Sequence, residues 1–218
     1  MKKIENGHLL VMLIALLAVG QMAQTIYVPA MSTIAAAFNV GDGAVQRVMA
    51  AYLMTYGASQ LFYGPLSDSI GRRPVVLLGM GIFILGSLTA LLAHSLNGLV
   101  LGAAIQGLGT GVAGVMARTM PRDLYEGRAL RHANSLLNMG ILISPLIAPL
   151  IGAGLTRLFG WQACFAFLLL LCLMVSCAIL RWMPETRPQT VQPRPLFSRY
   201  RPLLADSSFV RYLVILIG

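Results

Sequence analysis

The distribution of apolar residues predicts an all-α membrane protein with six spanning helices and the start of a seventh. Hydrophobic residues make up 57% of the 218 residues, whereas charged residues make up only 11%. A soluble domain carries about 25% charged residues. The apolar residues also come in runs of about 20, which is the length that crosses the hydrocarbon of a bilayer.

Six runs reach this length. The first run is longer than the others and contains Pro29, which predicts a kink or an extension into the membrane interface. A further apolar run opens near Phe209 and stops at Gly218, so we expect a fragment or a truncated product that ends inside a seventh helix. The predicted spans are residues 9–37, 44–64, 74–94, 98–118, 132–156 and 161–183.

Residues 184–208 differ in composition from the spans. This stretch holds five prolines among arginines, which is typical of a solvated linker. We therefore divide the chain into a six-helix bundle at residues 1–183, a cytoplasmic linker at 184–208 and the start of a truncated seventh helix at 209–218.

Basic residues are distributed unequally between the two sides of the predicted spans. Thirteen of the sixteen Lys and Arg residues lie on one side, which comprises the N-terminal tail, the second and fourth loops with the span ends beside them, and the stretch from the end of the sixth span onward. The opposite loops hold only Arg47 and Arg157. The positive-inside rule therefore predicts a multi-pass protein of the bacterial inner membrane with a cytoplasmic N-terminus. This distribution explains the net charge of +9 without nucleic-acid binding.

The most specific motif lies between the second and third predicted spans. A carboxylate in such a loop can pair with a nearby arginine, and glycines permit the tight turn that brings the two together. A pair that forms in one conformation and breaks in another acts as a gate. We expect gating roles for Gly64, Asp68, Gly71, Arg72 and Arg73, within Gly64-Pro65-Leu66-Ser67-Asp68-Ser69-Ile70-Gly71-Arg72-Arg73-Pro74.

This motif resembles the loop 2–3 signature of the major facilitator superfamily, although Ser69 stands where that family usually has a basic residue. Residues 117–125 and 144–152 are similar to two signatures of its twelve-span drug:proton antiporters. The resemblance implies the N-terminal six-helix bundle of the major facilitator fold, made of two inverted three-helix repeats. It also implies that the gate includes Arg118, Arg122, Asp123, Pro145 and Pro149.

Polar side chains inside the predicted spans are neutral and recur at helical spacing, so each group shares one face of a helix. The resemblance implies that these faces line a central cavity, where amides orient a ligand and aromatic rings supply contact area. Interhelical hydrogen bonds, worth roughly 0.6 kcal/mol each, explain any single one of these residues equally well. The expected substrate-binding residues are Gln21, Gln24, Thr25, Tyr52, Tyr56, Gln60, Gln106 and Thr110.

A proton site is not evident in the sequence. All seven acidic residues lie in tails, loops or span ends. The family often has an acid in the first span, where this chain has Thr25, and an arginine in the fourth span, where it has Ala103. Protons are therefore expected as the coupling ion from the resemblance alone.

These observations favour secondary active efflux of amphipathic small molecules in exchange for protons. The expected partners are the lipid bilayer and a missing C-terminal six-helix half. A narrow-specificity solute carrier is an alternative that the absence of charge in the presumed cavity disfavours, and a non-transporting truncated fragment is another. The sequence contains no catalytic constellation, metal-ligand spacing or Walker loop, so we expect neither an enzyme nor a cofactor.

Overall fold

The computed structural model describes residues 7–187, and its regular secondary structure over this range is entirely helical. The helices reproduce the six predicted spans, the first of which is divided among α1, η1 and α2. The predicted seventh helix and most of the predicted linker lie outside the described residues. The elements are α1 (Gly7–Thr25), the 3₁₀ helix η1 (Val28–Ala30), α2 (Met31–Ala37), α3 (Asp42–Ile70), α4 (Arg72–Leu91), α5 (Leu96–Leu124), α6 (Gly127–Phe159) and α7 (Gln162–Trp182).

The break in the first span confirms the kink predicted from Pro29. This proline lies in η1, between the end of α1 at Thr25 and the start of α2 at Met31. Proline has no backbone N–H and cannot continue the hydrogen bonding of α1. A side chain at Gly152 of α6 would collide with the carbonyl oxygen of Ile26, so a glycine is required where α6 crosses the break.

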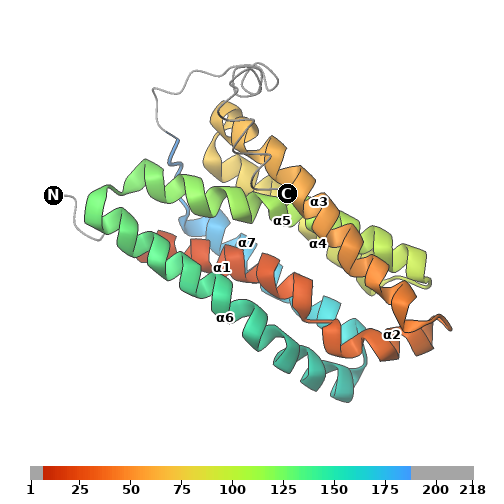
Figure 1. Cartoon of the computed structure of the whole chain (residues 1–218). Coiled ribbons are helices and arrows are strands. Elements are labelled where there is room, and N and C mark those ends of the chain that lie inside the picture. Colours follow the sequence, from red (N-terminus) through yellow and green to blue (C-terminus); the bar gives the residue numbers. More distant parts are fainter. Residues whose placement is uncertain (1–6, 188–218) are drawn as a thin grey trace, which may run out of the picture.

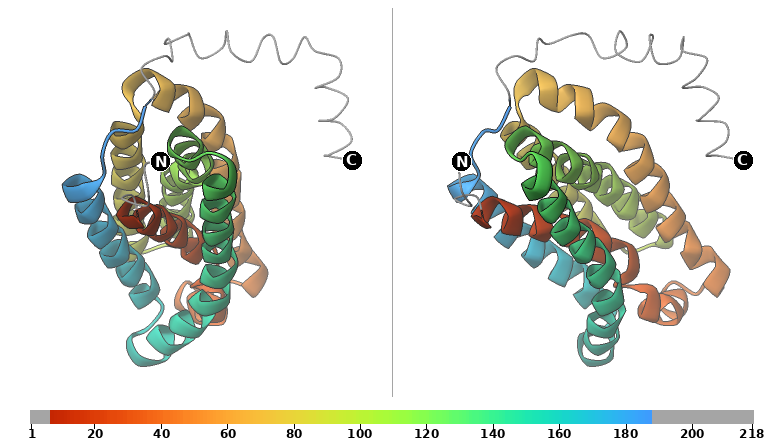
Figure 2. Two further views of the ribbon diagram at one scale, coloured as in Figure 1. Left: turned by 90° about the vertical axis from the view of Figure 1, so that its left-hand side faces the viewer. Right: turned by 60° about the vertical axis from the view of Figure 1, so that its left-hand side comes forward.

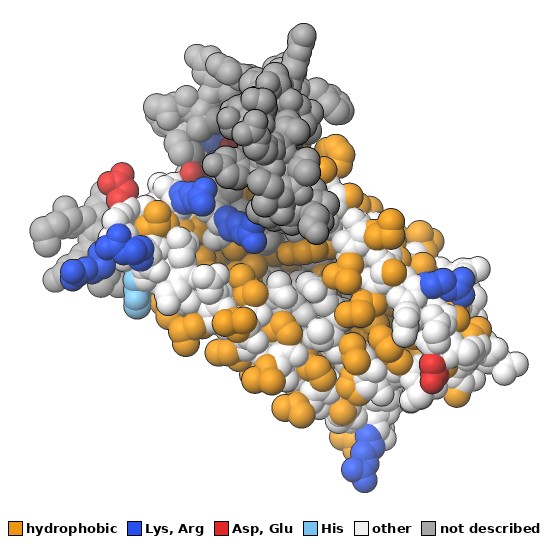
Figure 3. All heavy atoms as spheres, in the orientation of Figure 1, with side chains coloured by type: hydrophobic (Ala, Val, Ile, Leu, Met, Phe, Trp, Pro, Cys, Tyr) orange, Lys and Arg blue, Asp and Glu red, His pale blue; other side chains and the backbone are white. Residues whose placement is uncertain are grey.

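Five helical stretches are long and apolar enough to cross a membrane, namely residues 7–37 and helices α4, α5, α6 and α7. Helix α3 is not among them, although its 29 residues span about 43 Å. It carries many polar side chains, and Tyr52, Ser59 and Tyr63 are buried against the bundle. Large apolar residues such as Met54 and Leu61 are exposed instead. Figure 3 shows hydrophobic side chains over the middle of one face, with charged side chains toward its ends.

The helices pack in two groups, and each group combines one helix from one end of the chain with two helices from the other. Helix α5 lies against α3 and α4, and α1 lies against α6 and α7 (Figures 1 and 2). Contacts between α4 and α7 and between α1 and α5 join the groups. If α1–α3–α4 and α5–α6–α7 are two repeats, α1 corresponds to α5, α3 to α6 and α4 to α7. The contacts of α5 with α3 and α4 then correspond to those of α1 with α6 and α7, and the contacts α1–α5 and α4–α7 each correspond to themselves. This is the pairing expected of two inverted three-helix repeats.

Glycines let α5 approach two helices at once. A Cβ atom at Gly109 would lie 2.5 Å from the backbone nitrogen of Phe83 in α4, and one at Gly102 would lie 2.6 Å from that of Ala90. On its other side, side chains at Gly107 and Gly111 would overlap Thr55 and Ser59 of α3. Small residues of this kind allow backbones to approach closely in membrane helix bundles.

Candidate functional site

The turn between α3 and α4 is shaped by Gly71. This residue has a φ of +108°, a conformation that favours glycine, and it separates Ile70 from Arg72. A Cβ atom at this position would lie 2.6 Å from Oε2 of Glu185, a residue that follows α7. Gly71 therefore both makes the turn and leaves room for the segment after α7.

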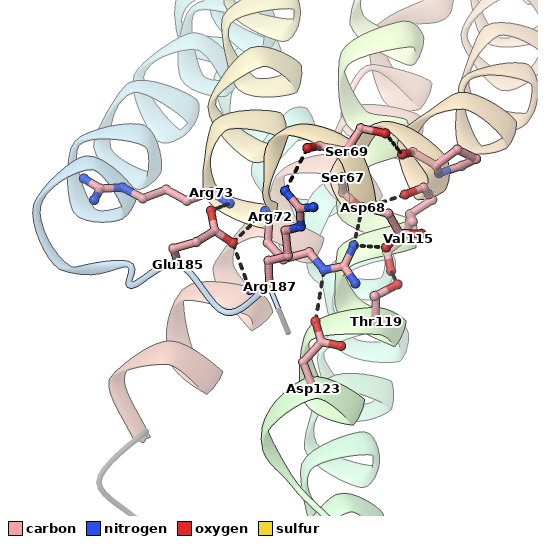
Figure 4. A network of polar contacts seen from close by, with 12 residues as sticks. Ser67, Asp68, Ser69, Arg72, Arg73, Val115, Thr119, Asp123, Glu185 and Arg187 are labelled. Atoms are coloured by element: carbon pink, nitrogen blue, oxygen red, sulfur yellow. Dashed lines mark hydrogen bonds and ion pairs between the residues drawn. The ribbon is translucent and has the colours of Figure 1, made fainter. Parts of the chain in front are cut away.

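Arg72 is the centre of an ion-pair network that joins three helices (Figure 4). Its guanidinium donates from Nη1 to Oδ1 of Asp68 in α3 at 2.5 Å and from Nε to Oδ2 of Asp123 in α5 at 3.0 Å. Nη1 also donates to Oγ of Ser67 at 2.6 Å. Arg72 is only 3% exposed. The ends of α3 and α5 are thus tied to the beginning of α4 by one buried side chain.

Glu185 is a member of this site that the sequence did not reveal. Its carboxylate accepts hydrogen bonds from the backbone N–H groups of Arg72 at 2.8 Å and Arg73 at 3.2 Å, which are unsatisfied donors at the start of α4 (Figure 4). Burial disfavours the charged carboxylate, but these bonds and one from the N–H of Arg187 outweigh it and lower the pKa of Glu185. A short carboxylate-bearing segment directly after the sixth span was the only signal for this contact.

Further bonds fasten the segment after α7 to the same turn. The guanidinium of Arg187 donates to the carbonyl oxygen of Ser69 at 2.8 Å. Next to this contact, the guanidinium of Arg73 donates to the carbonyl oxygen of Leu180 near the end of α7 at 2.5 Å, which joins α4 to α7. Residues 184–187, the first part of the predicted linker, therefore form a strap across the α3–α4 turn.

The other expected gating residues lie apart from Arg72. Gly64 is one turn before Ser67 in α3, and its carbonyl oxygen accepts a hydrogen bond from the Ser67 hydroxyl at 2.8 Å. Pro145 and Pro149 are inside α6, which remains one helix through both. Arg118 and Arg122 lie on α5 and line a cavity instead of joining the network.

Several expected substrate-binding residues are hydrogen-bonded inside the bundle. The hydroxyl of Tyr52 is 2.7 Å from that of Thr110 and donates to the carbonyl of Gly20 at 2.8 Å, which connects α3, α5 and α1. The amide of Gln106 donates to the Ser87 hydroxyl of α4 at 2.8 Å. All three polar side chains, those of Tyr52, Gln106 and Thr110, are at most 3% exposed. This burial favours the interpretation of these three residues as interhelical contacts.

The remaining expected residues lie nearer the surface of the bundle. Gln24 and Thr25 reach carbonyl oxygens one turn earlier on α1, each at 3.5 Å. Gln60 and the hydroxyl of Tyr56 lie over Gly114, where an added Cβ atom would be 3.3 and 2.8 Å away, respectively. Tyr56 and Gln21 also line the cavity described next.

A cavity of about 340 Å³ lies among α1, α3, α5 and α6. Its wall combines apolar, amide, phenol and guanidinium groups. The sequence predicted a cavity without charge, and this cavity differs because α5 continues beyond its apolar run and carries two arginines to the wall. The lining residues are Leu17, Gln21, Tyr56, Gly114, Ala117, Arg118, Arg122, Asn134, Leu137, Asn138 and Ile141.

Known proteins resemble this chain over its whole length. Multidrug resistance protein D of Escherichia coli (strain K12) is 59% identical over 218 residues, which are 100% of this chain and 55% of that relative. The solved structure of the multidrug transporter EmrD from Escherichia coli is 60% identical, covers 96% of this chain and 56% of that one, and has a TM-score of 0.57. The chain thus spans about half the length of the curated relatives it matches.

The fold also recurs at low sequence identity. The crystal structure of the peptide transporter POT shares 16% identity with a TM-score of 0.69 over 96% of this chain and 46% of that one, which is a likeness of fold alone. A sequence model described as the Major Facilitator Superfamily matches residues 13–218. The turn motif, the paired helix groups and these matches agree, and the chain belongs to the Major Facilitator Superfamily.

Proposed function

We propose that this chain forms one half of a secondary active transporter that exports amphipathic small molecules in exchange for protons. The observation that carries the proposal is the mixed lining of the cavity, in which Gln21, Asn134 and Tyr56 stand beside Leu17 and Ile141. Such a wall can bind the apolar part of a ligand while polar groups orient it. The similarity to Multidrug resistance protein D supports the same function.

The second half of the transporter completes the site in this proposal. Transporters of this architecture move two bundles against each other around a site near the middle of the membrane. The cavity borders α1, α3, α5 and α6, and a second six-helix bundle would close it. We place the N-terminus, the α3–α4 turn and the strap in the cytoplasm of a bacterial inner membrane, because most basic residues lie on that side.

The network around Arg72 is proposed to be a gate. It fixes the ends of α3, α4 and α5 relative to one another, so that rocking of the bundle requires a change in these contacts. Asp68→Asn should slow transport while leaving equilibrium ligand binding nearly unchanged, because Asp68 does not line the cavity. Asp42→Asn, an exposed carboxylate at the opposite end of α3, is the matched control.

Efflux measurements test the function itself. The chain is joined to the C-terminal half of Multidrug resistance protein D and expressed in cells that lack their own efflux pumps. We expect growth in the presence of several unrelated dyes and biocides, and a dependence of efflux on the proton gradient. The 218-residue chain expressed by itself should confer no growth. Saturable, gradient-driven efflux by that chain without the second half would contradict the proposed division into halves.

A carrier with a narrow range of charged solutes is the second candidate. It is favoured by one observation, which is that Arg118 and Arg122 place positive charge in the cavity wall. The growth test separates the two candidates, because a narrow-specificity carrier would protect against at most one compound.

A further inference from the structure

The cavity wall contains two basic side chains on one face of α5. Arg118 and Arg122 are four residues apart, which places them one helical turn apart on the same side. Asn134 and Asn138 have the same spacing on α6 and line the same cavity. Guanidinium and amide groups both donate hydrogen bonds, and guanidinium groups in particular match the geometry of carboxylate, sulfonate and phosphate oxygens.

The charge of these two arginines is not balanced by nearby carboxylates. Within residues 7–187, both ion pairs between side chains involve Arg72, and neither Arg118 nor Arg122 has a carboxylate within 4.0 Å. Asp123 follows Arg122 directly in the sequence, yet its carboxylate is engaged by Arg72. Successive residues on a helix point about 100° apart, so Arg122 faces the cavity while Asp123 faces the network.

The rest of the wall indicates what kind of anion fits. Leu17 of α1 lies on the cavity together with Leu137 and Ile141 of α6, so apolar surface adjoins the basic groups. The volume of about 340 Å³ is at the lower end of the range for small-molecule sites and is larger than an inorganic anion needs. A ligand that satisfies both parts of the wall has an acidic head group and an apolar tail.

We propose that this cavity binds the acidic head group of an amphiphile between Arg118 and Arg122, with its tail along Leu17, Leu137 and Ile141. The inference rests on the proposed function and narrows its substrate class. The same head-group chemistry occurs in free amphiphiles and in anionic phospholipids. Both sources satisfy the geometry, and the experiment below separates them.

Binding is measured with three fluorescent probes that share a dansyl group and a six-carbon chain and end in a carboxylate, a primary amide or an ammonium group. The 218-residue chain is purified in uncharged maltoside micelles. We expect the carboxylate to bind about tenfold to hundredfold more tightly than the amide, as for hydrogen bonds to charged groups. The ammonium probe should bind more weakly than the amide. Added salt should reduce only the carboxylate's advantage.

Variants assign this preference to the cavity. The double variant Arg118→Gln/Arg122→Gln should bind the carboxylate and the amide equally, and its unchanged amide binding shows that the cavity is folded. Arg118→Lys/Arg122→Lys should keep part of the preference because the charge remains. The control Arg128→Gln/Arg131→Gln removes the same charge from exposed positions of α6 outside the cavity wall and should keep the full preference.

The inference is overturned if the native chain binds the carboxylate no more tightly than the amide, or if the control loses the preference to the same extent. Phosphatidylglycerol added to the micelles identifies the source of the ligand. Displacement of the carboxylate probe by this lipid, and not by phosphatidylcholine, assigns the site to a phospholipid. Absence of displacement assigns it to a free amphiphile. Either result supports the acidic-head-group site.

Failure of this inference and failure of the proposed function give different results. Suppose that the chain joined to a second half exports neutral and cationic compounds, while the probes show no head-group preference. This result supports the efflux function and contradicts the acidic-head-group site. If the carboxylate probe is preferred and the joined protein exports nothing, the result supports the acidic-head-group site and contradicts the efflux function.

Discussion

Replacing Arg72 with methionine should destabilise the bundle much more than the same replacement at its neighbour Arg73. Methionine keeps much of the apolar stem, so the loss is confined to the guanidinium contacts. The substitution leaves the carboxylates of Asp68 and Asp123 without their shared partner, and their side chains are only 24% and 11% exposed. Water can therefore compensate for little of the lost interaction, least of all at Asp123.

The size of the effect follows from this burial. Breaking a buried ion pair by removing one partner costs roughly 3–5 kcal/mol. Asp68 is about one-quarter exposed, so solvent screening reduces its share, and we expect a loss of about 3 kcal/mol for the network. For a chain of this size, each kcal/mol lowers the unfolding temperature by roughly 2–4 °C, which gives a decrease of about 6–12 °C.

Thermal unfolding in micelles provides the assay. A maleimide dye that becomes fluorescent on reacting with thiols reports the exposure of Cys164 and Cys172, which are buried in α7. Cys177 is exposed and is first replaced with alanine. Arg73→Met is the matched control, because the side chain of this neighbouring arginine makes one hydrogen bond within residues 7–187, to the carbonyl of Leu180. It should lower the unfolding temperature by about 2–4 °C at most.

A combined variant separates the ion pairs from the packing of the arginine. Adding Asp68→Asn and Asp123→Asn to Arg72→Met removes the two carboxylates that lost their bond to Arg72, so part of the decrease in unfolding temperature should be reversed. Equal effects of Arg72→Met and Arg73→Met, or no recovery in the combined variant, would refute the view that Arg72 acts as a buried charge shared by two carboxylates.

Three further predictions concern packing, pH and topology. Gly109→Val should destabilise the bundle by about 1–3 kcal/mol in the same assay, because it drives α5 from α4, whereas Gly81→Val has open space and should be nearly neutral. The pKa of Glu185 is lower in the folded chain than its ordinary value of 4.5, so the ionised carboxylate stabilises the fold at pH values above 4.5. This stabilisation is lost as the pH falls through the folded-state pKa. The acid sensitivity of unfolding should therefore decrease in Glu185→Gln. Impermeant thiol reagents added outside cells should label Asn97→Cys and not Arg131→Cys, and the reverse pattern would invert the topology.

The fold was largely predictable because apolar run length reports membrane thickness directly. The same signal underestimates helix length. Helix α3 continues to Ile70 past its predicted end at residue 64, α5 continues to Leu124, and α6 begins at Gly127 instead of near residue 132. Pro65 lies within α3 and does not end it. Charged and polar residues extend these helices beyond their apolar runs, where hydropathy no longer distinguishes a helix from a loop.

The site was predictable only where its residues are close in sequence. Asp68 and Arg72 are four residues apart, and their pairing is confirmed. Glu185 lies more than 110 residues from the turn it caps, and a carboxylate directly after the sixth span does not by itself indicate which helix it contacts. The polar residues inside the spans remain divided between two interpretations, since helical spacing defines a shared face and does not tell whether a cavity or another helix lies opposite.

The last turns of α5 connect the cavity wall to the ion-pair network around Arg72. Arg122 contributes to the cavity wall, and Asp123, the next residue, binds Arg72 at the start of α4. A helix turn is rigid on the scale of one residue, so a displacement that improves the contact of Arg122 with a ligand also displaces the carboxylate of Asp123. Arg72 is paired with two carboxylates, whereas Arg118 and Arg122 have no carboxylate within 4.0 Å among residues 7–187, and the last turns of α5 connect the two groups. We therefore expect that ligand binding at the proposed site and release of the proposed gate are coupled through the last turns of α5, without any longer pathway across the bundle.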